Sequence, residues 1–225
     1  MKKISLLFLS GILAFASFSQ VTIGLRLSPA MCIDRVKDLN NADSVTFGNN
    51  GSGVRFAIGP TFDFKFGDNY AFSTGAWYLS SRAGMTTSDE HSSKKTTTTS
   101  IVSLQSVQIP FTFKVFTNEI ATDLKLYFQL GALGTINFYE KFKESNPALV
   151  GAYQNKYDMI DISLYMGAGL NYKIGESNAL FAGFYYNRGL TNVMNRKTEP
   201  LTGVKYNQNA KYNMDLIGLE VGVTF

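Results

Sequence analysis

The stretch that decides the fold is DMIDISLYMGAGLNYKI, residues 158–174. Apolar and polar residues alternate along it, so that Ile160 and Leu170 fall on one face while Asp161 and Lys173 fall on the other. A period of two is the pattern of a β-strand with one apolar and one polar face. Strands of soluble domains are usually shorter, so this length favours a transmembrane strand.

Seven further segments show the same alternation. In residues 55–66, for example, Phe56 and Phe66 fall on the same face. In residues 70–81 the pattern does not decide which face is apolar. The eight predicted strands are residues 21–28, 55–66, 70–81, 101–116, 124–139, 158–174, 179–187 and 211–225.

The connections between these strands are alternately long and short. The short ones are residues 67–69, 117–122 and 175–178, and the long ones are 29–52, 82–99, 140–157 and 188–210. The serines, threonines and lysines of residues 86–100 are interpreted as part of a loop. In an outer-membrane barrel the short turns are periplasmic, the long loops are extracellular, and an even strand number returns both termini to the periplasm. We therefore predict an all-β fold, an eight-stranded antiparallel up-and-down transmembrane β-barrel.

Glycine positions indicate which face of the strands is crowded. On strands with a clear pattern, Gly134 alone lies on the apolar face. The glycines of the polar face are Gly24, Gly59, Gly131, Gly167, Gly169, Gly183, Gly218 and Gly222. An eight-stranded barrel has an interior just wide enough for its own side chains, so we predict a filled lumen. The large inward side chains for which the glycines make room are Arg26, Arg55, Tyr127, Tyr165 and Tyr185. The alternative, a soluble lipocalin-like barrel, would turn its apolar face inward.

Two groups of charged residues face the lumen in this arrangement. The first group is Arg26, Arg55, Asp63, Asp161 and Glu220. Charges removed from water persist only when they are paired and hydrogen-bonded, so we interpret this group as a structural network. The second group lies close to the short turns and consists of Lys65, Lys114, Lys125 and Lys173. This basic collar is either a docking surface for an acidic periplasmic partner or a solvated rim.

Aromatic residues and prolines mark particular levels of the predicted barrel. Aromatic residues near strand ends are typical of the girdles at the two membrane interfaces. They include Phe64, Phe66, Tyr70, Phe138, Tyr139, Tyr172, Tyr212 and Phe225. Pro60 and Pro110 lie on strands that run in the same direction, each seven residues before a short turn. Because a closed barrel has no edge strand for a residue without an N–H group, we predict bulges at both prolines.

The N-terminal residues predict export from the cytoplasm. Lys2 and Lys3 precede an apolar run that ends at Phe18, which is typical of a signal peptide, here residues 1–19. Residues 20–225 then form one barrel domain, with 19 basic and 17 acidic residues and no charge excess that favours nucleic acid. The single cysteine, Cys32, excludes an internal disulfide and lies too far into the chain for a lipoprotein anchor.

Catalytic candidates are few. The run of residues 88–92 contains Ser88, Asp89, Glu90 and His91, but catalytic triads converge from separate elements rather than from one run. His91 is the only histidine, and we interpret it as a solvated loop residue. The sequence has no glycine-rich phosphate motif and no cysteine–histidine metal spacing. We therefore predict no enzymatic activity, no catalytic residue, no metal site and no cofactor.

Several motifs resemble the PorT family of outer-membrane β-barrels. They are DISLYMGAGLNY at residues 161–172, LFAGFYYNRGLTN at 180–192, VQIP at 107–110 and GAWY at 75–78. The sequence also ends, as such barrels do, on a phenylalanine, Phe225, the type of residue that the barrel-assembly machinery recognises. The resemblance implies a small barrel, similar in some members to a component needed for protein secretion across the outer membrane. It implies no catalytic residue.

These observations predict an integral outer-membrane protein that is structural or a partner-binding accessory. Its expected partners are outer-membrane lipids, the barrel-assembly machinery through the C-terminal strand, and an outer-membrane or periplasmic protein. The alternatives are a small channel and an adhesin-like surface barrel. A lipid-modifying barrel enzyme is a further alternative, with less support from the residues.

Overall fold

The computed structural model describes residues 20–38, 45–49, 53–89, 96–144, 156–192, 194–195 and 210–225. The predicted signal peptide, residues 1–19, and His91 lie outside the described residues. Within the described residues, no helix has the length and apolar character needed to cross a membrane.

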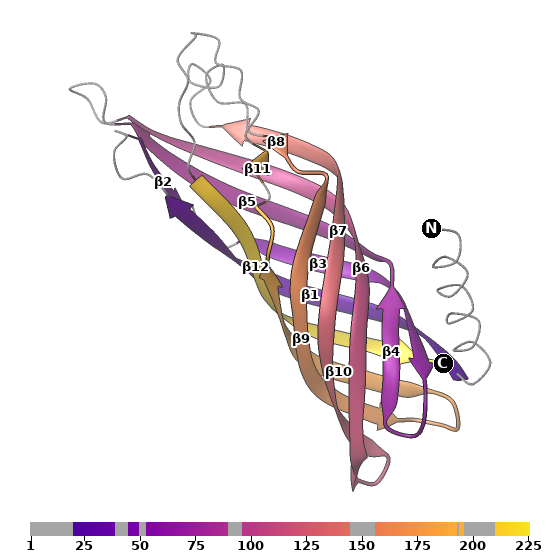
Figure 1. Ribbon diagram of the computed structural model, residues 1–225. Coiled ribbons are helices and arrows are strands. Elements are labelled where there is room, and N and C mark those ends of the chain that lie inside the picture. The colour runs from indigo at the N-terminus through magenta and orange to yellow at the C-terminus, as the bar shows by residue number, and fades with distance from the viewer. Residues whose placement is uncertain are drawn as a thin grey trace, which may run out of the picture.

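The described chain is built from antiparallel strands that follow one another around a ring (Figure 1). The strands of the ring are β1 (Gln20–Asp38), β3 (Val54–Lys65), β4 (Tyr70–Gly75), β5 (Trp77–Asp89), β6 (Thr96–Ala121), β7 (Leu124–Glu144), β9 (Ile160–Lys173), β10 (Ala179–Gly189) and β12 (Ala210–Thr224). The short strand β2 (Val45–Asn49) belongs to the same sheet and pairs with the end of β5, whereas β8 (Lys156–Tyr157) and β11 (Met194–Asn195) pair with each other in a separate two-stranded sheet.

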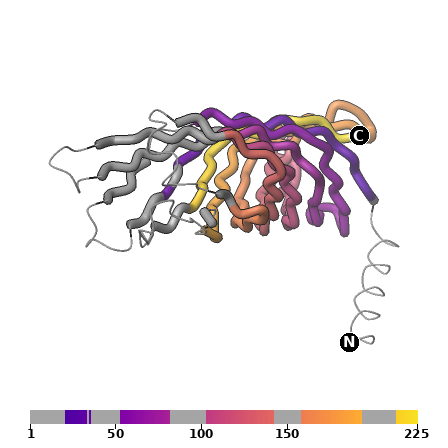
Figure 2. The backbone as a smooth tube through the Cα atoms, turned by 90° about the horizontal axis from the view of Figure 1, so that it is seen from above, coloured from indigo at the N-terminus to yellow at the C-terminus, as the bar shows by residue number. Residues whose placement is uncertain are grey.

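The ring closes because β1 pairs with strands from both ends of the chain. Leu25 of β1 is opposite Val223 of β12 on one side and Pro60 of β3 on the other. β4 and β5 occupy one place in the ring, since both pair with β3 and with β6. Eight places result, which confirms the predicted eight-stranded up-and-down barrel. Figure 2 shows the start of β1 and the C-terminus at the same end of the molecule.

The apolar face of the strands points outward. Leu130, Phe128 and Phe184 are 55%, 52% and 71% exposed, whereas polar residues such as Ser73 and Thr112 are buried inside the ring. This orientation contradicts the lipocalin-like alternative, in which the apolar residues would form the core. The parity of the third predicted strand is now settled, because Ala71, Ser73, Trp77 and Leu79 are all buried and therefore face inward.

Most residues of the predicted aromatic girdles are exposed where their side chains are described, whereas Phe64 is half-buried. Phe66, Tyr70, Phe138, Tyr139, Tyr172 and Phe225 are each between 38% and 60% exposed. Phe66, Tyr70 and Phe113 pack together beside the turn between β3 and β4, with ring centroids 5.6–6.2 Å apart. The side chain of Tyr212 lies outside the described part.

Several strands extend beyond their predicted ends. β6 continues to Ala121, so the connection to β7 is a tight turn at residues 122–123, where Asp123 has a positive φ of 62°. At the other end, β5 runs to Asp89 and β6 starts at Thr96, so the prediction of a loop over residues 86–100 was wrong for most of that segment. The threonines found there pair across the two strands, and threonine is a strong strand former.

The prediction of bulges at the two prolines was also wrong. The register of β3 with β1 and that of β6 with β7 pass Pro60 and Pro110 without a shift. The neighbouring chain is interrupted instead at Ala76, between β4 and β5. The Ala76 N–H donates to the Pro60 carbonyl over 3.3 Å, whereas Pro60 has no N–H to return the bond. The missing N–H group of Pro60 thus coincides with an interruption of the opposite strand, between β4 and β5, and not with a bulge in β3.

Candidate functional site: the lumen and its mouth

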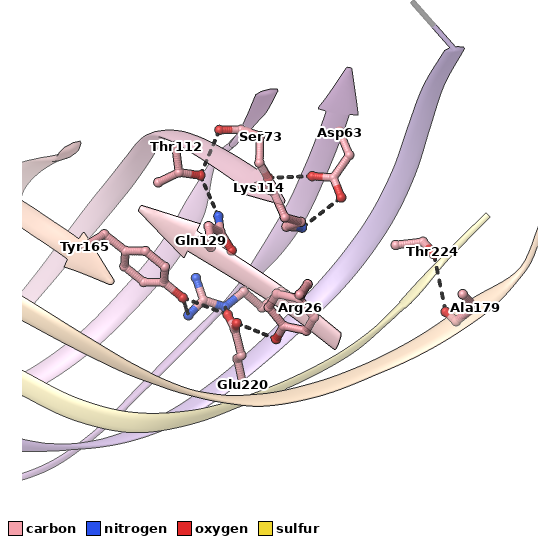
Figure 3. A network of polar contacts seen from close by, with 11 residues as sticks. Arg26, Asp63, Ser73, Thr112, Lys114, Gln129, Tyr165, Ala179, Glu220 and Thr224 are labelled. Carbon is pink, nitrogen blue, oxygen red and sulfur yellow. Dashed lines mark hydrogen bonds and ion pairs between the residues drawn. The ribbon is translucent and has the colours of Figure 1, made fainter. Parts of the chain in front are cut away.

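The middle of the lumen is occupied by a buried charge pair and two tyrosines. Arg26 Nε lies 3.0 Å from Glu220 Oε2, with both side chains no more than 3% exposed. The Tyr127 and Tyr165 hydroxyls donate to the two Glu220 oxygens over 2.6 and 2.7 Å, and Arg26 donates to the Tyr165 hydroxyl over 2.9 Å. Figure 3 shows Arg26, Tyr165 and Glu220 converging from separate strands. The predicted pairing of inward charges is therefore confirmed for Arg26 and Glu220.

Aromatic rings surround the Arg26 guanidinium. Its central carbon lies 3.8 Å from the Trp77 ring centroid and 4.8 Å from that of Tyr185. Tyr165 and Tyr185 stack on each other with centroids 5.4 Å apart. Cation–π contacts partly replace the hydration that a buried guanidinium loses. These side chains are buried, and they fill the lumen at this level. We call them the central layer, which consists of Arg26, Trp77, Tyr127, Tyr165, Tyr185 and Glu220.

A second buried pair lies between the central layer and the short turns. Lys114 Nζ is 2.8 Å from Asp63 Oδ2, and Ser73 Oγ donates to Asp63 Oδ1 over 2.5 Å. Figure 3 shows these three residues as a group. Lys114 also lies over the Tyr127 and Phe181 rings, 5.6 and 5.8 Å from their centroids. Lys114 is thus a lumen residue, and its assignment to the basic collar was wrong because its long side chain reaches inward to a carboxylate.

The other predicted inward charges, Arg55 and Asp161, are also buried, at 1% and 7% exposure. Asp161 lies at the start of β9 and accepts a hydrogen bond from the Thr191 hydroxyl. Burial of these side chains agrees with the predicted parity of β3 and β9.

A polar cluster that the sequence did not suggest lies on the outward face at the other end of the barrel. Arg35 holds both Asp215 oxygens, from Nε over 2.6 Å and from Nη2 over 3.0 Å. The Tyr186 hydroxyl and the Gly189 N–H donate to the same carboxylate, each over 3.0 Å. Asp215 is 3% exposed although it shares the outward parity of Ile217, because Arg35 and its neighbours cover it. This bidentate pair ends the outward apolar surface of β1, β10 and β12.

The remaining three lysines of the collar line a hollow at the short-turn mouth of the barrel. Its volume is about 620 Å³. Lys65 and Lys173 are exposed, and Lys125 is half-buried. Acidic residues line the same hollow, namely Asp63, Asp68, Glu119, Asp123 and Glu176. The mouth therefore carries both signs of charge rather than the uniformly basic collar that the sequence predicted.

The described residues contain no group of three or more histidine, cysteine, aspartate or glutamate side chains placed to hold a metal ion. Of the possible triad residues, Ser88 and Asp89 belong to β5, and Glu90 and His91 lie outside the described part.

Comparisons with known proteins agree with this geometry. A family model described as "Outer membrane protein beta-barrel domain" matches residues 15–195. The outer membrane protein OprG from Pseudomonas aeruginosa has a similar solved structure, with 14% identity, a TM-score of 0.54, and coverage of 92% of this chain and 97% of that chain. The Neisserial surface protein A also matches, with 13% identity, a TM-score of 0.49, and coverage of 91% and 95%. No curated protein sequence matches the chain.

At 14% identity the OprG structure supports the fold alone, whereas the family match covers most of the chain and is independent of it. The exposed apolar face is what a membrane-spanning barrel requires, since only closed barrels and helices satisfy the backbone inside a bilayer. The chain belongs to the outer membrane protein beta-barrel domain family and is an integral β-barrel of the bacterial outer membrane.

Proposed function

We propose that this barrel conducts no solutes, catalyses no reaction, and serves as a structural or partner-binding component of the outer membrane. The observation that carries this proposal is the central layer, in which Arg26, Glu220, Trp77 and Tyr165 occupy the lumen and bind one another. A channel needs a water-filled interior, and an enzyme needs a reactive group with access to substrate. A layer of buried side chains that contact one another supplies neither.

A role in protein secretion, as in part of the PorT family, is the finer form of this proposal. It requires a protein partner, which would bind through the extracellular segments or through the periplasmic mouth. The two surfaces lie at opposite ends of the barrel, so they can be altered independently.

Exchange of the extracellular segments tests the first surface. Because residues 86–89 and 96–100 are strand, the exchange is limited to residues 90–95 and 196–209, replaced by glycine–serine linkers of equal length. We expect the barrel to fold, since loops contribute little to the core, and the partner to be lost from detergent extracts analysed by mass spectrometry. The second surface, the periplasmic mouth, is tested by reversing the charges of Lys65, Lys125 and Lys173.

If the mouth is the docking surface, the lysine variant loses the partner, the segment exchange retains it, and the wild-type interaction weakens as salt rises. A barrel that purifies alone from gentle detergent in every variant and at native abundance contradicts the partner-binding role and leaves a structural one.

The barrel-assembly machinery is a further proposed partner, through the C-terminal strand. Phe225 is 60% exposed, and its N–H donates to the Ile23 carbonyl over 2.7 Å. Phe225→Asp should lower the yield of folded barrel several-fold, while the unfolded chain still reaches the periplasm. The measurement is the fraction of protein that migrates differently on gels before and after boiling, and a normal fraction would refute this recognition.

A further inference from the structure

The hollow at the periplasmic mouth has the size of a ligand site but an unusual lining. Its volume of about 620 Å³ lies within the range of small-molecule pockets. Such pockets are mostly apolar, whereas this one is lined mainly by charged and polar side chains, with Phe116 and Ala179 among the few apolar ones. A ligand that fits it must therefore be hydrophilic and charged.

Each of the three periplasmic turns contributes the same pair of charges to the hollow. Every pair has a lysine at the end of a strand and an acidic residue within the turn itself. The pairs are Lys65 with Asp68, Lys125 with Asp123, and Lys173 with Glu176. Lys125 is half-buried, and the other five side chains are exposed. We call Lys65, Lys125 and Lys173 the lysine ring, and Asp68, Asp123 and Glu176 the acidic ring.

The lysines and the acids of the two rings do not form ion pairs with one another. Within the described part of the chain, none of the six side chains forms an ion pair, whereas Arg26, Lys114 and Arg35 each do. Glu119 also lines the hollow, opposite Lys125 in the pairing of β6 with β7, so the hollow presents three ammonium groups and, besides Asp63, four carboxylates. A ligand with matching charges would gain from both rings.

The inner end of the hollow is closed. Asp63 lines it, and its carboxylate is bound by Lys114 over 2.8 Å and by Ser73 over 2.5 Å. Lys114 in turn contacts Tyr127, which belongs to the central layer through Glu220. Because the Asp63 charge is neutralised by Lys114, it does not oppose an anion held by the lysine ring. A ligand enters and leaves by the same mouth, so the hollow is suited to binding rather than to passage.

We propose that this hollow binds a short peptide in its zwitterionic form, with the terminal carboxylate on the lysine ring and the amino group on the acidic ring. A simple anion is attracted by the lysine ring but repelled by the carboxylates, and a simple cation is attracted by the carboxylates but repelled by the lysines. A molecule that carries the two charges at opposite ends satisfies both rings. A few peptide residues also match a hollow of this volume. This inference goes beyond the proposed function and does not rest on it.

Calorimetric titration of the full-length barrel in a nonionic detergent provides the test. The probes are triglycine, N-acetyl-triglycine, which lacks the positive charge, and triglycine amide, which lacks the negative one. We expect triglycine to bind at least tenfold more tightly than either blocked form, with an affinity that falls as salt is raised. No measurable binding of triglycine, or equal affinity for triglycine and its N-acetyl form, overturns the proposal.

Two triple variants assign the binding to the two rings. K65Q/K125Q/K173Q should weaken triglycine binding at least tenfold, and D68N/D123N/E176Q should abolish the preference for triglycine over N-acetyl-triglycine. The matched control is K141Q, because Lys141 is an exposed lysine near the opposite end of β7. All six ring residues lie at the mouth, so each variant is expected to fold, which heat-modifiable migration on gels checks. Unchanged triglycine affinity in the folded lysine variant contradicts the assignment.

Discussion

Replacing Glu220 with alanine should lower the free energy of unfolding of the barrel by about 3–5 kcal/mol, the usual cost of removing one partner of a buried ion pair. Glu220 balances the Arg26 charge and accepts hydrogen bonds from Tyr127 and Tyr165. Its removal leaves a buried guanidinium without a counter-ion and two buried hydroxyls without their acceptor. Urea titration of the folded, heat-modifiable form in detergent measures the loss.

The matched control is Glu176→Ala, which makes the same chemical change in an exposed periplasmic turn. It should alter the stability by about 0.5 kcal/mol or less. If the two alanine variants unfold at the same urea concentration, Glu220 is not the centre of a buried network and the account of the lumen is wrong.

An arginine placed on the outward face should lower the free energy of unfolding by a comparably large amount, which depends on the depth of the residue in the bilayer. Leu130 is 55% exposed and lies near the middle of the outward apolar residues of β7. Leu130→Arg should cost about 2–4 kcal/mol in lipid bilayers, the range for arginine near the bilayer midplane. The measurement is the free energy of unfolding in phospholipid vesicles.

Leu190→Arg is the control for depth. Leu190 is similarly exposed, at 52%, but it follows the end of β10 beside the Arg35–Asp215 pair. Its substitution should cost about 0–1 kcal/mol, as expected near an interface. Equal small effects at both positions would mean that the outward face does not contact the hydrocarbon of a bilayer.

The sequence predicted the barrel and its orientation because both depend on local alternation. Residues such as Arg26, Tyr127, Tyr165 and Glu220 face inward as their parity requires, and the inward glycines leave room for them. At Gly169, for example, a Cβ atom would lie 2.6 Å from the Tyr127 hydroxyl oxygen. Glycine at such a position indicates in the sequence that a large inward neighbour is present.

The contacts that the sequence did not predict depend on which strands pair with each other and on how far each strand extends. Trp77 was missed as a lumen residue because its segment reads equally well in either parity, and the pairing of β4 and β5 with β3 decides the matter. Asp215 meets Arg35 only because β1 continues beyond its predicted end at residue 28 and pairs there with β12. Lys114 was misassigned because parity gives a direction but not the reach of a long side chain.

Conductance of the wild-type barrel tests the central claim most directly. The claim is that the lumen is closed by the central layer, in which Arg26, Trp77, Tyr165 and Glu220 contact one another. Purified barrel should be reconstituted in planar bilayers, and incorporation should be verified by heat-modifiable migration of the recovered protein. We predict no steady conductance under an applied voltage, whereas large, stable, open channels would contradict the account.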